Sequence, residues 1–151
     1  MKKSKMRALR QVHQTGTSLI EVLISVLILG IGLLGIASMQ AITLRNGQSS
    51  MERSQAVMHT YSILDSMRAN LIEARANNYN MTRTCAVPAV GTTLAQNDLN
   101  AWMTGLQGTI GVAACGTILC ASNVCTITVE WNDSRGSGGS SAQTTITRSR
   151  I

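Results

Sequence analysis

The sequence contains only two histidines, no phenylalanine and a single proline among its 151 residues. His13 and His59 lie far apart, and neither belongs to an H-E-x-x-H metal motif. No G-x-S-x-G motif occurs, and the few acidic residues form no evident catalytic group. We therefore expect no enzyme, no cofactor and no metal, and we expect His59 to lie on the surface of a helix.

Charge is missing from a long stretch near the N-terminus. No charged side chain lies between Glu21 and Arg45, so residues 22–44 form an uncharged and mostly apolar run. A helix needs about 20 such residues to cross a bilayer core. Five basic residues and no acidic residue precede the run: Lys2, Lys3, Lys5, Arg7 and Arg10. A basic flank stays on the cytoplasmic side, so the body of the protein is predicted to lie outside the cytoplasm.

Two other interpretations fit this stretch less well. A cleaved secretory signal has an apolar region of roughly 7–15 residues and then a small-residue site, which Ala37 and Ser38 do not clearly form. The letters GIGLLG, Gly30 to Gly35, match the dinucleotide-binding pattern G-x-G-x-x-G, and Glu52 follows at a suitable distance. The chain downstream lacks the apolar parallel strands of that fold, whereas glycine is frequent in membrane helices.

Glu21 stands where the apolar run begins. A carboxylate there is unfavourable unless it is paired, and an ionisable residue in a membrane segment suggests a function. A cut between Gly16 and Thr17 would place a new α-ammonium group one helical turn from Glu21, in the same chain or in a neighbour. The alternative is a carboxylate that merely reaches the membrane interface.

These residues carry a resemblance to a known family. The basic leader, Gly16 and the following TSLIEVLISVLILGIGLLG resemble the class III signal of type IV pilins and type II secretion pseudopilins. In that signal a glycine precedes the cut, and a glutamate is the fifth residue of the mature chain. Four further segments resemble the V-type minor pilin of the type IV pilus: GIGLLGIASMQ, DSMRAN from Asp65, NDLNAWMTGL from Asn97, and VEWND ending at Asp133.

The resemblance implies an α+β, type IV pilin-like fold, in which a long N-terminal helix packs on a small C-terminal antiparallel sheet with disulfides. Its parts would be a leader peptide at residues 1–16, a transmembrane and assembly half of the long helix at 17–44, an amphipathic half at 45–77, and a sheet domain at 78–151.

The resemblance also implies processing and partners. A prepilin peptidase would cut after Gly16 and methylate Thr17, although pilins usually have phenylalanine at that place. Glu21 would set the register against a neighbouring subunit, and Gly30, Gly32 and Gly35 would allow close helix packing. The mature protein would wait in the inner membrane with its body in the periplasm. It would then join other minor pilins and the major pilin, prime assembly of the pilus and remain near its tip.

The basic character of the chain belongs mainly to its leader. The formal net charge is +6, but five of the 13 basic residues precede Gly16, which leaves eight against seven acids. The later arginines are spread among acidic residues, a pattern typical of a solvated helix face. We therefore predict no specific nucleic-acid partner.

The chain beyond the apolar run alternates helical and strand patterns. A polar helix is predicted up to about Ala76, where asparagines stop it. Its apolar stripe, with spacings of three and four residues, comprises Val57, Tyr61, Leu64, Met67 and Leu71. Its charged residues, Glu52 among them, are expected on the remaining surface.

Shorter elements follow this helix. A second helix is predicted over residues 94–106, with Leu99, Trp102, Met103 and Leu106 on one face. A hairpin is predicted over residues 111–119 and 124–131, because apolar and polar residues alternate in its second arm. Residues 134–141 read as a flexible glycine-serine loop, and residues 142–148 as a weak final strand.

The four cysteines, Cys85, Cys115, Cys120 and Cys125, all follow the apolar run. An even number on the oxidising side of a membrane favours disulfides, and their spacing departs from zinc patterns. Four cysteines permit three pairings, and the sequence does not decide among them. A turn at residues 121–124 would favour Cys120 with Cys125, and therefore Cys85 with Cys115.

Two other functions are compatible with the sequence. A pseudopilin of a type II secretion system would share the N-terminal stretch, and the co-purifying major subunit would distinguish it. An uncut, signal-anchored periplasmic binding protein for DNA or adhesion would keep its leader, and binding of DNA would weaken steeply with salt.

Overall fold

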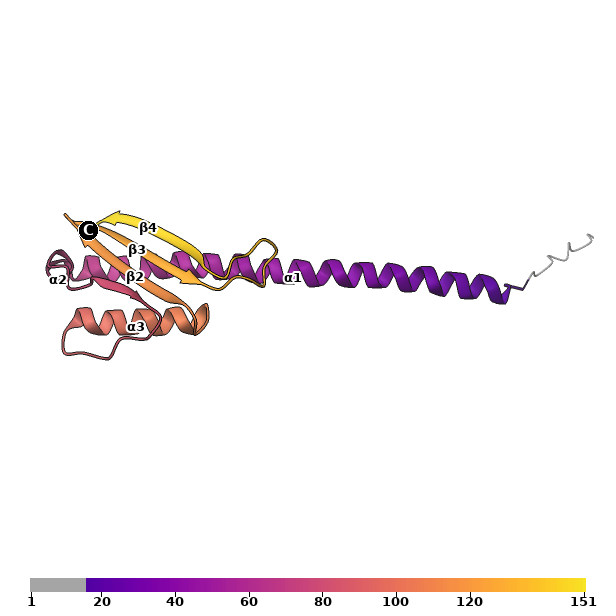
Figure 1. Cartoon of the computed structure of the whole chain (residues 1–151), viewed down its shortest axis with the longest axis horizontal. Helices are drawn as coiled ribbons and strands as arrows, with labels where there is room; N and C mark the ends of the chain where they lie inside the picture. The colour runs from indigo at the N-terminus through magenta and orange to yellow at the C-terminus, as the bar shows by residue number, and fades with distance from the viewer. Residues whose placement is uncertain (1–15) are drawn as a thin grey trace, which may run out of the picture. The chain divides into compact units, whose positions relative to one another are not determined.

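The computed structural model describes residues 16–151, so the predicted leader peptide lies outside the described residues except for Gly16. In chain order the elements are α1 (Leu19–Ala69), α2 (Leu71–Arg75), β1 (Met81–Thr84), α3 (Leu94–Thr109), β2 (Cys115–Ala121), β3 (Val124–Trp131) and β4 (Gln143–Arg150). Figure 1 shows them. The fold is α+β, and the chain divides into two compact units between Gln40 and Ala41.

The four strands form one antiparallel sheet in the order β1-β2-β3-β4. A two-residue turn joins β2 to β3, and its residues Ser122 and Asn123 have positive φ angles of 50° and 62°. Such a turn matches the twist of the strands that it joins. The turn lies where the sequence placed it, and it fixes the pairing of Cys120 with Cys125 across the hairpin.

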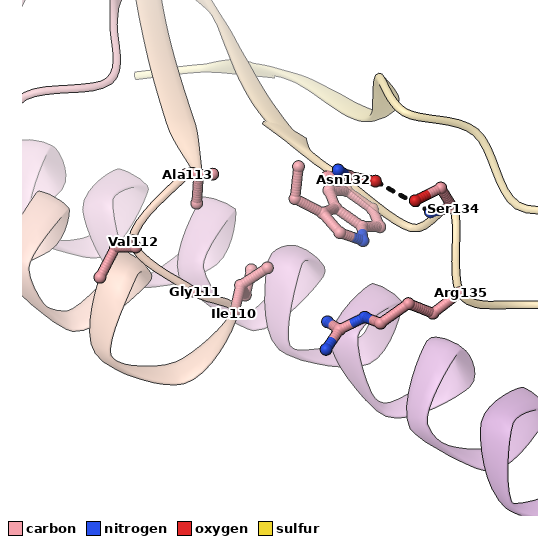
Figure 2. A pocket seen from close by; sticks show the side chains of 9 residues that line it. Ile110, Gly111, Val112, Ala113, Asn132, Ser134 and Arg135 are labelled. Carbon is pink, nitrogen blue, oxygen red and sulfur yellow. Dashed lines mark hydrogen bonds between the residues drawn. The ribbon is translucent and has the colours of Figure 1, made fainter.

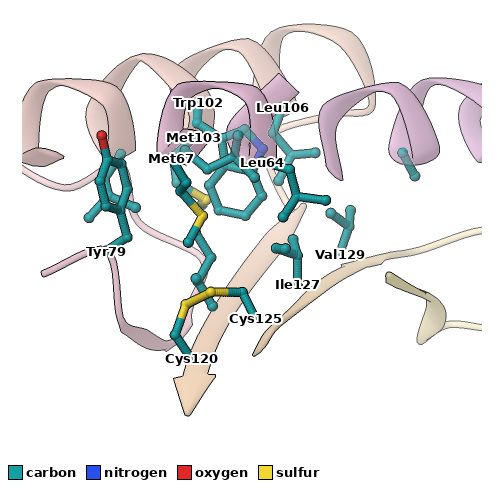
Figure 3. Close-up of a cluster of buried hydrophobic side chains, with 14 of the residues drawn as sticks. Leu64, Met67, Tyr79, Trp102, Met103, Leu106, Cys120, Cys125, Ile127 and Val129 are labelled. Atoms are coloured by element: carbon teal, nitrogen blue, oxygen red, sulfur yellow. A yellow bond between two sulfur atoms is a disulfide. The ribbon is translucent and has the colours of Figure 1, made fainter. Parts of the chain in front are cut away.

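The core of the second unit lies between the sheet and the two helices α1 and α3 (Figure 3). Inward-facing Ile127 and Val129 of β3 are fully buried, and Leu64 and Met67 of α1 are buried with them. The indole Nε1 of Trp102 on α3 donates a hydrogen bond to the carbonyl of His59 on α1, at 2.9 Å. This bond fixes α3 beside α1.

Two predicted features of α1 differ from the structure. Val57 and Tyr61 are 40% and 53% exposed, and the buried face of the helix instead comprises Ala56, Thr60, Ile63, Leu64 and Met67. The reason is that alanine and threonine fit a close helix-to-sheet contact as well as larger residues do. Glu52, which we expected on the surface, is 8% exposed and pairs with Arg135.

The long helix also ends earlier than predicted. It ends at Ala69, and the short helix α2 follows after Asn70, whose φ and ψ of −125° and 57° are not helical. The Asn70 side chain donates to the hydroxyl of Tyr79 at 3.3 Å. Asparagine competes with helical backbone bonding in this way, so it interrupts a helix where a tertiary partner is present.

The predicted second helix is confirmed, and it extends to Thr109. Its four predicted inward residues are all buried. Thr93 and Gln96 form a capping box at its start, because each side chain accepts a hydrogen bond from the other residue's backbone N–H. The four-residue strand β1, at the edge of the sheet, was not predicted from the sequence. The predicted last strand is present as β4.

Candidate functional site

The candidate site is the beginning of α1. Gly16, Thr17 and Ser18 precede the helix and are exposed. The Ser18 carbonyl accepts hydrogen bonds from the N–H groups of Glu21 and Val22, at 3.0 and 3.2 Å. The Gly16–Thr17 peptide bond therefore lies in exposed, non-helical backbone just ahead of the first turn.

Glu21 lies in that first turn and is exposed. The free N–H groups of a helix N-terminus carry partial positive charge, which stabilises a carboxylate there. Among residues 16–151, no side chain forms an ion pair or a hydrogen bond with the carboxylate of Glu21. It is therefore available to a positive group from elsewhere.

The segment after Glu21 presents apolar side chains that no other part of residues 16–151 covers. Every leucine, isoleucine, valine and methionine from Leu19 to Leu44 is at least 48% exposed. Globular proteins rarely expose an apolar surface of this extent to water. The helix is long and apolar enough to cross a membrane.

The small residues of this segment are not equivalent. Successive residues of an α-helix are turned by about 100°, so Ser25, Gly32 and Gly35 lie within about 40° of Glu21 around the axis. Gly30 lies on the opposite side, about 180° from Glu21. A Cβ atom added at any of the three glycines would meet no other atom within 4 Å. The three predicted packing glycines therefore cannot all contact the same neighbouring helix. We call the face that carries Glu21, Ser25, Gly32 and Gly35 the Glu21 face.

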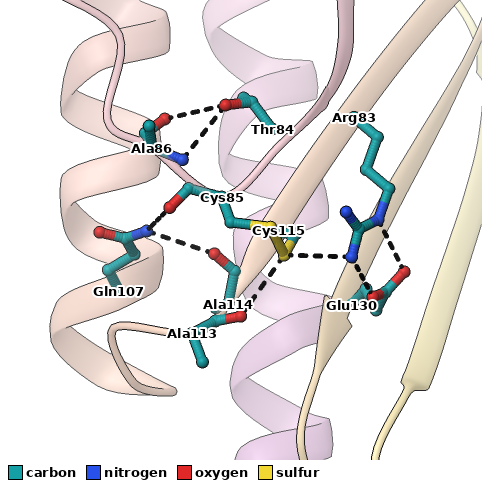
Figure 4. Close-up of a disulfide and its surroundings, with 9 residues drawn as sticks. All are labelled: Arg83, Thr84, Cys85, Ala86, Gln107, Ala113, Ala114, Cys115 and Glu130. Atoms are coloured by element: carbon teal, nitrogen blue, oxygen red, sulfur yellow. Dashed lines mark hydrogen bonds and ion pairs between the residues drawn. A yellow bond between two sulfur atoms is a disulfide. The ribbon is translucent and has the colours of Figure 1, made fainter.

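The four cysteines belong to the second unit. Cys85 is joined to Cys115, and Cys120 to Cys125, which is the pairing that the position of the turn favours. Figure 4 shows the first disulfide, beside which Gln107 Nε2 donates to the carbonyls of Cys85 and Ala114 at 2.8 and 3.3 Å. The two bonds attach the loop after β1 and the start of β2 to α3.

His59 is not a freely exposed residue. Its Nε2 lies 2.8 Å from the hydroxyl of Thr109, and its burial lowers the pKa of the imidazole. A hollow of about 280 Å³ beside it is lined by His59, Ser62, Ile63, Ser66, Asp98, Ala101, Trp102 and Gly105. The Asp98 carboxylate accepts a hydrogen bond from Tyr79 at 2.5 Å. Residues 16–151 contain no group of three or more His, Cys, Asp or Glu side chains suited to a metal.

A second hollow, of about 330 Å³, lies between the end of α3 and the end of β3 (Figure 2). It is lined by residues 110–114, Trp131, Asn132, Ser134 and Arg135. Trp131 is buried, and its Nε1 has no hydrogen-bond partner. That atom is closed off from the hollow as well as from solvent, so a molecule in the hollow would not contact it.

The attachment of residues 133–137 to α1 was not predicted from the sequence. Asp133 forms an ion pair with Arg53, and Arg135 forms one with Glu52. The Ser137 N–H donates to Asn46 Oδ1 at 3.1 Å. No local sequence signal marks these contacts, because the partners are at least 80 residues apart.

Comparisons with protein-family models, with curated proteins and with solved structures find no match to this chain.

Proposed function

We propose that this chain is a pilin-like subunit, and specifically a minor pilin of the type IV pilus that primes assembly and is built into the filament. One observation carries the proposal. An exposed Gly16–Thr17 bond, a glutamate in the first helical turn and an apolar helix without cover coincide at one end of α1.

The geometry of the cut supports processing by a prepilin peptidase. The Gly16–Thr17 bond is exposed and lies outside the helix, where a protease can reach it. After the cut, the α-ammonium of Thr17 stands four residues before Glu21, which would be about 6 Å along the axis if the first turn extended to Thr17. This charge neutralises Glu21 within one chain or between neighbours, which lowers the energy of a carboxylate near lipid.

The apolar helix supports assembly. A helix that leaves the membrane exposes this surface to water unless other apolar helices cover it. On the Glu21 face, the serine and the two glycines let a neighbouring backbone approach closely. The carboxylate on the same face selects the register in which a neighbour's positive N-terminus lies beside it.

The second unit supports export. Its two disulfides are suited to an oxidising compartment such as the periplasm. Its ion pairs also attach the loop after β3 to α1. In the proposed filament this unit would form the head of the subunit.

The first experiment is mass spectrometry of the N-terminus of protein extracted from its native membrane. A chain that begins at Thr17, with or without a methyl group, supports the proposal. A chain that still carries residues 1–16 would mean a permanent anchor and would overturn assembly after cleavage.

The second experiment replaces Glu21. We expect Glu21→Val to insert into the membrane normally but to be depleted from sheared pili. Ile36→Val is the matched control, because it changes the same helix without removing a charge. Equal recovery of Glu21→Val and wild type in the pili would contradict the role of Glu21. Recovery of the chain with a secretion-system major subunit instead would favour a pseudopilin.

A further inference from the structure

The outer edge of β4 presents a row of backbone groups that the sheet does not use. The hairpin pair Ala121 and Val124 encloses a two-residue turn, so these two residues exchange backbone hydrogen bonds. Even-numbered residues of β3 therefore bond to β2, and odd-numbered residues bond to β4. The Ile151 N–H donates to the Asn123 carbonyl at 3.0 Å, which follows the same parity.

The unused groups on β4 belong to alternate residues. Because the odd-numbered residues bond to β3, the N–H and C=O groups of Thr144, Ile146, Arg148 and Arg150 point away from the sheet. The Arg150 carbonyl accepts a bond from Ser149 Oγ. For the other backbone groups of this row, residues 16–151 supply no partner. Figure 1 shows β4 at the free edge of the sheet.

The side chains of the same four residues lie on the outer face of the sheet and are exposed. Ile146 is 66% exposed. The intervening side chains face α1 instead: Thr147 Oγ1 lies 2.8 Å from Thr60 Oγ1, and Arg68 donates to Ser149 Oγ at 3.1 Å. A strand added outside β4 would therefore bond to the free backbone groups of these four residues, and its side chains would lie beside theirs.

The charge of this edge is uncompensated. Within residues 16–151, neither Arg148 nor Arg150 forms an ion pair. The acidic side chains of the second unit are already engaged by other residues: Glu52 by Arg135, Asp65 by Arg68, Glu73 by Asn78, Asp98 by Tyr79, Glu130 by Arg83, and Asp133 by Arg53. Two adjacent cations on one strand face thus lack a counter-charge.

We propose that the outer edge of β4 binds an extended acidic segment of another protein, which adds to the sheet as a fifth, antiparallel strand. Its backbone bonds to the free groups of β4, as in other cases of strand addition. Two acidic residues at alternate positions lie directly beside Arg150 and Arg148, and an apolar residue two positions later lies beside Ile146. Directly opposite side chains of this kind stabilise paired strands.

This proposal goes beyond the proposed function, because the assembly contacts proposed above lie on α1 and do not involve β4. A second copy of this chain is not the occupant, because its own β4 offers no acid to the arginines. Charged residues on an edge strand also serve to prevent pairing. If the arginines only protect the edge, no peptide strand will bind to β4. The experiment below distinguishes this protective role from the proposed binding.

The probe is a capped peptide, Thr-Glu-Thr-Glu-Thr-Val-Thr, titrated into the isotope-labelled full chain in zwitterionic detergent micelles. We expect saturable NMR shifts and slower amide hydrogen exchange at Ile146, Arg148 and Arg150, which lie opposite the valine and the two glutamates of the peptide. Thr145 and Thr147 already bond to β3, so their exchange should change little. The control peptide has the same composition with its two glutamates adjacent, which places only one of them on the arginine face.

Two variants test the two parts of the contact. Ile146→Pro removes an outward N–H and leaves the ladder to β3 intact, since proline is tolerated at such edge positions; it should abolish binding. The double variant Arg148→Gln with Arg150→Gln should weaken binding roughly fivefold. Arg75→Gln is its control, because Arg75 is another exposed arginine without an ion pair in the described chain, and it should bind like wild type.

Three results would overturn the proposal. The first is no saturable shift with the alternating peptide. The second is equal affinity for the two peptides, or protection that does not alternate along β4, which would indicate unspecific attraction of an anion to arginine. The third is unchanged affinity in the arginine double variant, which remains interpretable even where Ile146→Pro disturbs folding.

Discussion

The carboxylate of Asp133 accepts a hydrogen bond of 2.6 Å from the hydroxyl of Ser49, although 84 residues separate them. Arg53 reaches the same oxygen at 3.3 Å, and Asp133 is 2% exposed. Beside this pair the polarity is reversed, because Glu52 of the helix binds Arg135 of the loop. Two ion pairs therefore hold the glycine-serine loop after β3 on α1. In one pair the loop supplies the acidic partner, and in the other it supplies the basic partner.

We expect Asp133→Ala to destabilise the second unit by about 2–3 kcal/mol, because hydrogen bonds to a charged group are stronger than neutral ones and this carboxylate is buried. Urea unfolding of the full chain in micelles, followed by circular dichroism, measures the change.

Asp65→Ala is the matched control. Asp65 also pairs with an arginine, Arg68, but that pair lies three residues apart on the exposed helix surface. Such pairs contribute about 0.5 kcal/mol or less. Equal destabilisation by both variants would contradict a special role for the buried carboxylate.

These contacts mark how far the sequence predicts the fold. Periodicity located α3 and its buried face, and alternation located β3, because both signals are local. The loop over residues 134–141 looked flexible, since its glycines and serines suit a linker. Its attachment depends on Ser49, Glu52 and Arg53, and no local pattern reveals a partner so distant in sequence.

The candidate site shows the same division. Gly16, Thr17 and Glu21 follow from a local motif, and the structure places all three at one helix end. The three glycines look alike in the sequence, yet the helix turns Gly30 away from Gly32 and Gly35. The free edge of β4 had no signal, because only the complete sheet order shows which strand lacks a neighbour.

Tyr79 should titrate at unusually high pH. Burial, and then its hydrogen bond to Asp98, raise the pKa of the phenol to about 12. The unfolded chain loses this proton near pH 10, so the folded state binds more protons between about pH 10 and 12. Stability from this group is thus complete below pH 10 and is lost as the pH rises toward 12.

Ultraviolet absorbance of the phenolate, measured against pH together with circular dichroism, follows this titration. In Tyr79→Phe the late absorbance step should disappear. The expectation would be wrong if the wild type, while still folded, showed an absorbance step near pH 10 and Tyr79→Phe lacked that step. Tyr79 would then ionise at the ordinary pH of a tyrosine despite its hydrogen bond.

The two disulfides should differ in their access to a reductant. Cys85 is exposed, whereas Cys120 is 8% exposed and Cys125 is fully buried. Thiol exchange requires approach to a sulfur atom. We therefore expect low concentrations of a reductant to open Cys85–Cys115 first, as detected by alkylation and peptide mass spectrometry. Simultaneous alkylation of all four cysteines in the folded protein would show that exposure does not control the order.

The position of the glycines around α1 yields a final prediction, which depends on the proposed assembly. Close helix packing in a membrane or filament needs a small residue where two backbones meet. Gly32 lies on the Glu21 face, and Gly30 lies on the opposite side. We expect Gly32→Leu to reduce recovery in sheared pili roughly fivefold, which corresponds to a loss of about 1 kcal/mol in packing.

Gly30→Leu is the matched control, because it adds the same side chain to the same helix. Both variants have room for the new side chain in the isolated subunit, so both should fold and reach the membrane in equal amounts. Comparing membrane-extracted with sheared material separates insertion from assembly. If Gly30→Leu is depleted from pili as strongly as Gly32→Leu, the neighbouring subunits do not pack against the Glu21 face, and the carboxylate does not set their register.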